Sequence, residues 1–285
     1  MTVPKIGKVG IWSLELRFGD PDESSRAAAE IEKMGFGTIW IPGGIDDGAP
    51  GDVERLLRAT STITIATGIL NIWKHDPAEL AAWFAGLAAD QQARTLLGIG
   101  VSHGPLIGEA WAKPLAKTSA FLDGFLGAGM PADNVCLAAL GPKMLALSGE
   151  RTAGAHPYLV SPSHSAEARA ILGPDKLLAP EQGVILETDP GKARELAVEA
   201  LAHYRELPNY RNNWHRLGFT ETEINDLDDR LLHALFAMGD ASRARERVRE
   251  HHAAGADHVC MQVIGCNGSF DALVEKCRQL AKVLF

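Results

Sequence analysis

Short apolar runs rich in Val and Ile alternate along the chain with longer stretches of helical periodicity, and this alternation constrains the fold more than any other feature of the sequence. Each run is bounded by Gly or Pro. A run with almost no polar interruption, such as residues 63–70, is typical of a strand buried on both faces of a parallel sheet. The pattern therefore predicts repeated strand–helix units.

We expect eight strands, at about residues 8–13, 37–42, 63–70, 95–100, 134–140, 154–159, 177–186 and 257–264. Helices are expected between them, including residues 23–34, 51–61, 77–89, 114–126, 143–153 and 163–172. Asp76 and Asp189 are placed to cap helices that begin with proline, and Gly35 and Gly255 to end helices. Even spacing of eight units, with no GxGxxG after the first strand, favours a (β/α)8 TIM barrel over an open doubly wound sheet.

Length and composition fit one domain spanning residues 1–285. The chain has 285 residues and is 46% apolar, so it can bury a large core. Two smaller domains would also fit this length, but no break in composition separates two halves. The polar region at about residues 202–235 departs from the strand–helix pattern, and we expect a helical insertion there, over the barrel mouth.

Charge and cysteine usage narrow the class of protein. There are 28 Lys and Arg residues against 36 Asp and Glu, and the net charge of -8 argues against nucleic acid as a partner. Neither a secretory leader nor a membrane-spanning run is visible, so the expected location is cytoplasmic. The four cysteines lack metal-ligand spacing and are expected to be reduced, buried thiols, with no metal site.

Active sites of such barrels lie at the carboxyl ends of the strands. The residues that follow the eight expected strands are therefore the ones to consider for function. They are Trp12 and Ser13, residues 42–44, residues 70–73, residues 101–103, residues 139–142, residues 156–158, Glu187 and Gln262.

Several of these junctions carry short motifs. They are MGFGTIWIP at residues 34–42, ATGILN at 66–71 with HDPA at 75–78, LGIG at 97–100, AALGPKM at 138–144 with GAH at 154–156, and REHHAAGADHV at 249–259. In this order and spacing they resemble the luciferase-like flavin and deazaflavin oxidoreductases over nearly the whole chain. The resemblance implies a cofactor ring lying across the barrel mouth.

Family members often have a cis peptide bond before a non-proline residue in the third strand, which here would join Gly68 and Ile69 and face the ring. Without the resemblance, Gly68 would be interpreted as a bulge in a strand. The junction at residues 138–143 leaves backbone N–H groups free near Gly141 at a helix start, where anions are favoured. Residues 161–165 form a second such start. Ordinary helix caps explain both segments equally well from sequence alone.

The resemblance thus gives a set of expected cofactor-binding residues: Gly68, Ile69, Asn71, Ala139, Leu140, Gly141, Pro142, Lys143, His156, Ser161 and Ser163. Expected substrate-binding residues are Trp12, Gly43, Gly44 and Trp73. The two glycines would leave room above the ring.

Gly43 and Gly44 also stand where many deazaflavin-dependent relatives acting on alcohols have an Asp-His pair, so the usual general base is missing. His103, after the fourth strand, is the expected catalytic residue, because imidazole transfers protons near neutral pH. A structural hydrogen bond to a loop carbonyl is the equal alternative for His103. His156 is a second candidate, and His75 is expected to be structural.

The expected function is that of an oxidoreductase using coenzyme F420, a deazaflavin, with hydride moving between its C5 atom and a small organic substrate. The alternatives are an FMN-dependent luciferase-like monooxygenase and, in another class, a protein that binds a flavin or deazaflavin without catalysis. Members of the family often form homodimers, but no motif here defines an interface.

Overall fold

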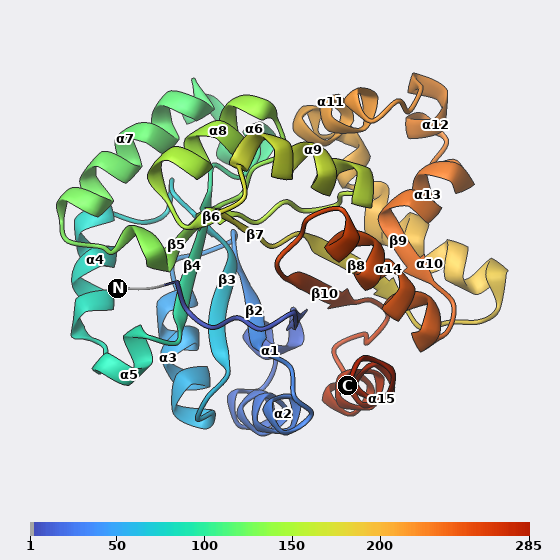
Figure 1. The fold of residues 1–285 in the computed structure, drawn as a ribbon, viewed down its shortest axis with the longest axis horizontal. Coiled ribbons are helices and arrows are strands. Elements are labelled where there is room, and N and C mark those ends of the chain that lie inside the picture. The colour runs from blue at the N-terminus through green and yellow to red at the C-terminus, as the bar shows by residue number, and fades with distance from the viewer. Residues whose placement is uncertain (1–2) are drawn as a thin grey trace.

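Ten parallel strands form one sheet in the computed structural model, which describes residues 3–285 (Figure 1). In sequence order the strands are β1 (Val9–Trp12), β2 (Thr38–Gly43), β3 (Thr64–Asn71), β4 (Thr95–Gly100), β5 (Val135–Leu137), β6 (Gly154–Ala155), β7 (Leu177–Leu178), β8 (Glu181–Ile185), β9 (Phe236–Met238) and β10 (Val259–Val263). Their order across the sheet is β7-β6-β5-β4-β3-β2-β1-β10-β8-β9. Consecutive strands from β1 to β7 are therefore neighbours, as strand–helix repeats require.

The two ends of this sheet meet because β7 and β8 are consecutive pieces of one extended segment. Only Ala179 and Pro180 separate them, while β7 pairs with β6 and β8 pairs with β10. The Glu181 N–H donates to the Pro157 carbonyl at 2.7 Å, and the Cys260 N–H donates to the Pro180 carbonyl at 2.9 Å. Because this segment is bonded on both sides, the sheet closes into a barrel, and the predicted (β/α)8 architecture is confirmed.

Some predicted strand boundaries are wrong. The strand expected at residues 177–186 is interrupted at Pro180, which has no N–H group to donate to a sheet ladder. The strands expected at residues 134–140 and 154–159 already end at Leu137 and Ala155. The additional strand β9 was not expected, because three residues are too few to show an alternating pattern.

Helices surround the barrel (Figure 1). They are α1 (Glu15–Phe18), α2 (Pro21–Lys33), α3 (Ala49–Ala59), α4 (Pro77–Gly86), α5 (Ala89–Gln92), α6 (Gly104–Ile107), η1 (Gly108–Ala110), α7 (Pro114–Gly127), η2 (Ala132–Asn134), α8 (Pro142–Arg151), α9 (Pro162–Leu172), α10 (Pro190–Ala202), α14 (Ala241–Ala253) and α15 (Phe270–Leu284). As predicted, the Asp76 and Asp189 side chains accept hydrogen bonds from the first turns of α4 and α10. Gly35 and Gly255 follow α2 and α14 with φ of +97° and +98°, conformations that glycine adopts without strain.

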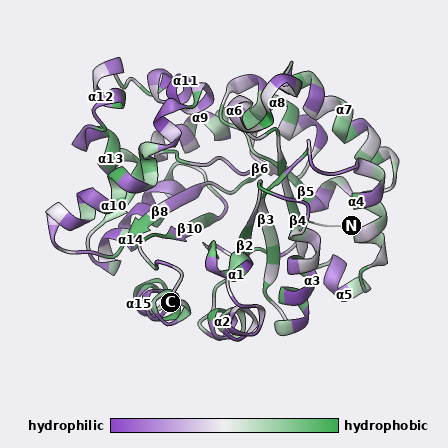
Figure 2. Cartoon of the chain, turned by 180° about the vertical axis from the view of Figure 1, so that it is seen from behind, coloured by the Kyte–Doolittle hydropathy of each residue, from purple (hydrophilic) through white to green (hydrophobic). Residues whose placement is uncertain are grey.

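Side chains alternate between two apolar layers along each strand. Trp40 of β2 and Cys136 of β5 belong to a cluster inside the barrel, whereas Ile39 and Ile41 pack in the layer between the sheet and the helices. Figure 2 shows hydrophilic and hydrophobic residues alternating along helices such as α2 and α15, which face this layer with one side. All four cysteines are buried and free, as expected.

The region from residue 202 to 235 is helical, which confirms the predicted insertion. It contains η3 (Tyr204–Glu206), α11 (Pro208–Arg216), α12 (Glu221–Asn225) and α13 (Asp229–Leu235). The elements η3 and α13 contact α10, and α11 and α12 are drawn above α13 in Figure 1. Trp214 and Leu231 are fully buried in an apolar cluster that joins the insertion to α10 and to Leu159 after β6. The insertion is therefore anchored to the carboxyl-end side of the barrel.

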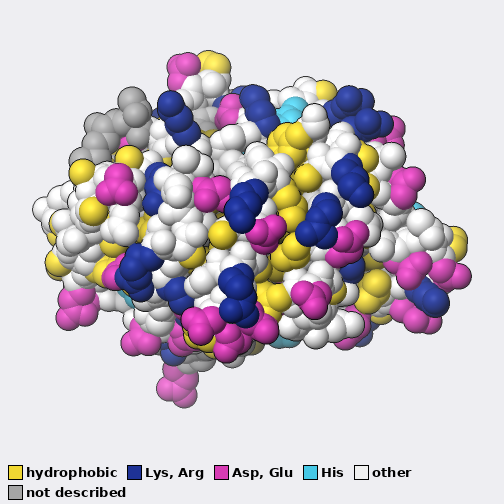
Figure 3. Space-filling model, turned by 90° about the horizontal axis from the view of Figure 1, so that it is seen from below, with side chains coloured by type: hydrophobic (Ala, Val, Ile, Leu, Met, Phe, Trp, Pro, Cys, Tyr) yellow, Lys and Arg dark blue, Asp and Glu magenta, His cyan; other side chains and the backbone are white. Residues whose placement is uncertain are grey.

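The outer surface carries charges of both signs. Figure 3 shows Lys and Arg side chains interspersed with Asp and Glu on one face of the molecule. Within residues 3–285, none of the helices has the length and apolar character needed to cross a membrane.

Candidate active site

The peptide bond between Gly68 and Ile69 in β3 is cis, at the position that the family resemblance predicted. The Trp12 indole N–H, from the end of β1, donates to the Gly68 carbonyl at 3.0 Å. A Cβ atom at Gly68 would lie 2.8 Å from Trp12 Nε1 and 2.9 Å from His156 Nε2. Because both distances are shorter than real Cβ contacts allow, this position requires glycine.

His156 lies directly behind this bond, after β6. Its ring stacks on Trp40 with centroids 4.2 Å apart, and its Nδ1 atom lies 2.7 Å from the Ala179 carbonyl oxygen. A carbonyl can only accept, so Nδ1 carries the proton and Nε2 is an unprotonated acceptor, buried without a partner among residues 3–285. Burial lowers the pKa of His156 to about 4, although the Ala179 carbonyl opposes the shift. His156 is therefore neutral near neutral pH and presents a lone pair, and no proton, toward Gly68.

Two helices begin side by side at the next part of the rim. Gly141 and Ser161 occupy the positions before α8 and α9, and neither caps its helix with a side chain. These two helices pack against each other. The Ser161 and Ser163 hydroxyls lie 2.7 Å apart. Since uncapped N-terminal N–H groups carry partial positive charge, this part of the rim favours an anion.

Arg216, at the end of α11, adds a cation to the same place. Its Nη2 atom is 3.6 Å from the position that a Cβ of Gly141 would take, and it donates to the Asn213 side chain at 2.9 Å. His164 of α9 lies below, with Nε2 2.9 Å from the Leu140 carbonyl. The predicted residues Ala139, Leu140, Gly141, Pro142 and Lys143 are all in this region, with Ala139 buried and Lys143 exposed. Arg216 was missed because nothing in its local sequence relates it to α8.

The predicted residues after β2, β3 and β4 form a neighbouring group. Asn71 is buried, donating to the Gly44 carbonyl at 3.2 Å and accepting from the Trp73 N–H at 3.1 Å. The expected free space is found at Gly44, where a Cβ would meet nothing within 4 Å, and not at Gly43, where it would lie 2.7 Å from Leu70 Cδ2. Asn71 thus holds the loop after β2 against the loop after β3.

His103 and Trp73 line the same side of the rim. The Trp73 indole N–H donates to the Val101 carbonyl at 2.9 Å. His103 precedes α6, its ring centroid is 5.5 Å from that of Tyr210, and its Nδ1 atom is buried without a partner in the part of the chain described. The hydrogen bond to a loop carbonyl that would have made His103 structural is not found there.

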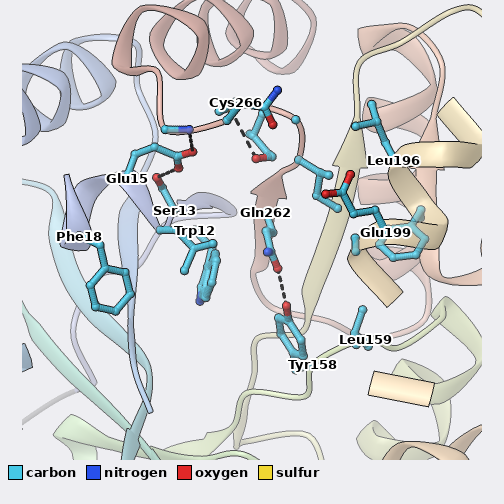
Figure 4. Close-up of a pocket in the computed structure, with 18 of the residues that line it drawn as sticks. Trp12, Ser13, Glu15, Phe18, Tyr158, Leu159, Leu196, Glu199, Gln262 and Cys266 are labelled. Carbon is cyan, nitrogen blue, oxygen red and sulfur yellow. Dashed lines mark hydrogen bonds between the residues drawn. The ribbon is translucent and has the colours of Figure 1, made fainter. Parts of the chain in front are cut away.

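A cavity of about 650 Å³ lies beside Trp12, between the ends of β1 and β10, α10 and the loop after β10 (Figure 4). Of the residues predicted from sequence as site residues, only Trp12 lines it. Tyr158 lies in its wall and donates to Gln262 Oε1 at 2.7 Å, and the Tyr204 hydroxyl is 3.4 Å away from that of Tyr158. Tyr158 and Gln262 were identified as rim positions, whereas Tyr204 comes from the insertion and gave no sequence signal.

Glu181 is buried beneath this wall at the start of β8. Its Oε2 atom accepts from the Leu159 N–H at 2.9 Å, and Oε1 has no partner within the described chain. Burial raises the pKa of Glu181 to about 8, against the effect of the Leu159 N–H. The carboxyl group is therefore held protonated near neutral pH. Glu181 was not identified from the sequence, because a single Glu within a strand carries no recognisable motif.

The structure thus places most of the predicted residues in three regions of the rim, around the Gly68–Ile69 bond, at the starts of α8 and α9, and in the loops after β2, β3 and β4. The region at the Gly68–Ile69 bond offers an aromatic and backbone surface, and the region at the two helix starts offers positive potential. Among residues 3–285, no group of three or more His, Cys, Asp or Glu side chains is arranged to hold a metal ion. This combination suits an organic ligand with a planar body and an anionic tail.

Residues 9–128 match a family model described as luciferase-like monooxygenase. Three solved structures share the fold over nearly their whole lengths. They are an F420-dependent secondary alcohol dehydrogenase in complex with an F420–acetone adduct (TM-score 0.69, 16% identity, 98% of this chain and 99% of that chain), a coenzyme F420-dependent tetrahydromethanopterin reductase from Methanopyrus kandleri (0.66, 16%, 97% and 98%), and the oxygenating constituent of a diketocamphane monooxygenase from Pseudomonas putida in complex with FMN (0.65, 13%, 97% and 98%). At these identities the likeness concerns the fold.

Proposed function

We propose that this protein is an oxidoreductase that uses coenzyme F420 and moves a hydride between the deazaflavin C5 atom and a small organic substrate. Its sequence motifs and the match of residues 9–128 point to the same luciferase-like family. The observation that carries the proposal is the pairing of the Gly68–Ile69 surface with the positive helix starts at Gly141 and Ser161. A planar ring attached to a phosphate tail needs both. The shared fold with F420-dependent enzymes supports the choice of cofactor.

The residues present fit such a group. His156 Nε2 and His164 Nδ1 are buried acceptors without partners in residues 3–285, as expected beside a ligand that donates hydrogen bonds. In this proposal Gly68, Ile69 and His156 support the ring, while Gly141, Ser161, Ser163 and Arg216 hold the tail. The cofactor, when bound, supplies hydride chemistry at its central ring, and the chain supplies orientation and a dry surface.

His103 takes the role of general base in this proposal. Burial lowers its pKa below the usual 6.5, the Asn209 side chain opposes that shift, and His203 reinforces it. The imidazole is therefore neutral at neutral pH, and its partnerless Nδ1 atom can accept a proton from a substrate hydroxyl.

Two other functions remain as alternatives. An FMN-dependent monooxygenase is favoured by the match of residues 9–128 and by the FMN-bound structure of the same fold. A protein that binds a deazaflavin without turnover is favoured by Gly43 and Gly44, which stand where an Asp-His pair is common in alcohol-oxidising relatives.

Titration of the purified protein with F420 and with FMN separates these functions. Tryptophan fluorescence reports binding, because Trp12 and Trp40 lie beside the proposed ring position. We expect F420 to bind more tightly than FMN and to change its absorbance when a substrate from an alcohol and aldehyde panel turns over. Tighter binding of FMN would contradict the proposal, and F420 binding without turnover of any panel member would favour the non-catalytic alternative.

A further inference from the structure

We propose that the 650 Å³ cavity beside Trp12 binds an amphipathic organic molecule that carries a positive charge, such as an aryl-alkyl amine, and excludes carboxylic acids. The inference rests on the proposed function only in naming this molecule as the substrate. The binding itself depends on the cavity alone. Its volume is within the range of sites for small organic ligands.

The charged side chains in the cavity wall are all acidic. Glu15 and Glu199 belong to the wall, which contains no Lys, Arg or His. Figure 4 shows the two carboxylates on opposite sides of the strand that carries Gln262. An anionic ligand would therefore approach like charges from two directions, whereas a cation would be attracted from both.

Glu199 is available to a ligand. Its side chain is exposed on α10 and forms no hydrogen bond or ion pair with any other residue of the described chain. Glu15 is partly engaged, because Ser13 Oγ donates to its Oε2 at 2.7 Å and the Gly268 N–H donates to its Oε1 at 3.4 Å. Glu15 is thereby fixed in position while keeping its negative charge.

The nearest cations do not line the cavity. Arg17 is paired with Asp46 and Asp52, and its guanidinium lies over the Phe18 ring, 4.8 Å from the ring centroid. The Lys276 ammonium approaches from α15 and donates to the Ile264 and Gly265 carbonyls, at 2.9 Å each. These carbonyls occupy the lysine, which lies behind the loop and outside the cavity wall.

Aromatic side chains complete the case for a cation with an apolar body. Trp12, Phe18, Tyr158 and Tyr204 all line the cavity, and one face of Phe18 is already occupied by Arg17. Aromatic faces attract amines and quaternary ammonium groups through their quadrupole, and they also bury apolar carbon. Trp12 further connects the cavity to the Gly68 carbonyl through its indole N–H, so a ligand here lies beside the proposed hydride-transfer surface.

The test compares three ligands of similar size, phenethylamine, phenethyl alcohol and phenylacetate, on the protein with and without F420. Binding is followed by tryptophan fluorescence and by ligand-observed NMR. Glu199→Gln is the informative variant, and Glu195→Gln is its control, because Glu195 is exposed on the same helix and removes the same charge without lining the cavity.

We expect phenethylamine to bind at least about tenfold more tightly than phenylacetate, with the difference shrinking as salt is added. Glu199→Gln should weaken phenethylamine about threefold to fivefold, as for a solvent-accessible ion pair, and leave phenethyl alcohol unchanged. Equal or tighter binding of phenylacetate, no saturable binding of the amine, or equal effects of the two variants would overturn the proposal. Failure of F420 to bind, with amine binding intact, would instead contradict only the proposed function.

Discussion

His103 had two interpretations from sequence, catalytic and structural, and our proposal assigns it the catalytic one. Its Nδ1 atom is buried without a partner among residues 3–285, and its ring packs at a tilt against the Tyr210 ring, with centroids 5.5 Å apart. In a structural histidine, both ring nitrogens normally form hydrogen bonds or one of them is exposed to water. An Nδ1 atom without a hydrogen-bond partner is expected of a general base in the absence of its substrate.

Replacing His103 with Ala should lower kcat by about 100-fold or more and change the dissociation constant of F420 little, because a base acts on the substrate and not on the cofactor. The wild-type rate should fall as pH drops below the pKa of His103, which burial places under the usual 6.5, and stay level above it. Steady-state rates across pH check both points. His233→Ala is the control, since His233 is exposed on α13, and an unaltered rate in His103→Ala would remove His103 from the mechanism.

At the scale of elements, α11 adds side chains to the rim that the strand–helix repeats do not supply. It carries Tyr210 and Trp214 into the core of the insertion and places Arg216 beside Gly141. The anion-favouring region therefore combines two barrel helices with one side chain from the insertion. Removing that side chain should affect the anionic tail of a ligand and spare its ring.

Arg216→Gln should weaken F420 about fivefold, as for loss of an exposed charge-assisted contact, and should not change binding of the same deazaflavin lacking its phosphate tail. The two dissociation constants, measured at low salt, check this. Arg249→Gln on α14 removes the same charge from an exposed position away from the rim and serves as the control. Equal weakening of both ligands would mean that Arg216 stabilises the fold and does not hold the tail.

The fold could be predicted from sequence because strand and helix periodicities are local properties. Asp76 and Asp189 marked helix starts for the same reason. Pro180 was visible in the sequence. Its missing N–H group interrupts the strand only because a neighbouring strand pairs with this segment, and that pairing is not a local property. Strand ends were less accurate, because pairing with a neighbour decides where a strand stops.

The candidate site was predictable only where it lies in local motifs. The Gly68–Ile69 bond and the helix start at Gly141 belong to short segments that carry the family resemblance. Tyr204 and Arg216 reach the site from the insertion, and their approach depends on packing between segments far apart in the chain. A pattern of residue types in a short stretch of sequence cannot predict such a contact.

On the scale of the whole molecule, the barrel interior buries ionisable groups that oppose stability at both ends of the pH range. Burial lowers the pKa of His156 to about 4 and that of His258 to about 3. Each is neutral in the folded protein, whereas the unfolded chain takes up a proton below about pH 6.5, so their contribution to stability is present above that pH and is lost as the pH falls toward the folded pKa. Glu181 acts in the alkaline direction.

Glu181 has a folded pKa raised from 4.5 to about 8 by burial. Below the unfolded pKa the carboxyl is protonated in both states, and stability is unaffected. Between these two values the unfolded chain loses the proton that the folded protein keeps, so stability falls as the pH rises through this window, at up to about 1.4 kcal/mol for each pH unit. Glu181 therefore lowers the free energy of unfolding at neutral as well as alkaline pH, while it stays a neutral carboxyl in the folded protein.

Glu181→Gln keeps an acceptor oxygen for the Leu159 N–H and cannot ionise. We therefore expect the variant to match the wild type at about pH 4.5 and to be more stable by several kcal/mol at about pH 9, with the gap opening between those values. Urea unfolding at a series of pH values measures it, and the exposed Glu195→Gln serves as the control for the lost charge. Parallel stability curves for the wild type and Glu181→Gln would show that this carboxyl ionises normally inside the barrel, and the protonated acid beneath the cavity wall would have to be abandoned.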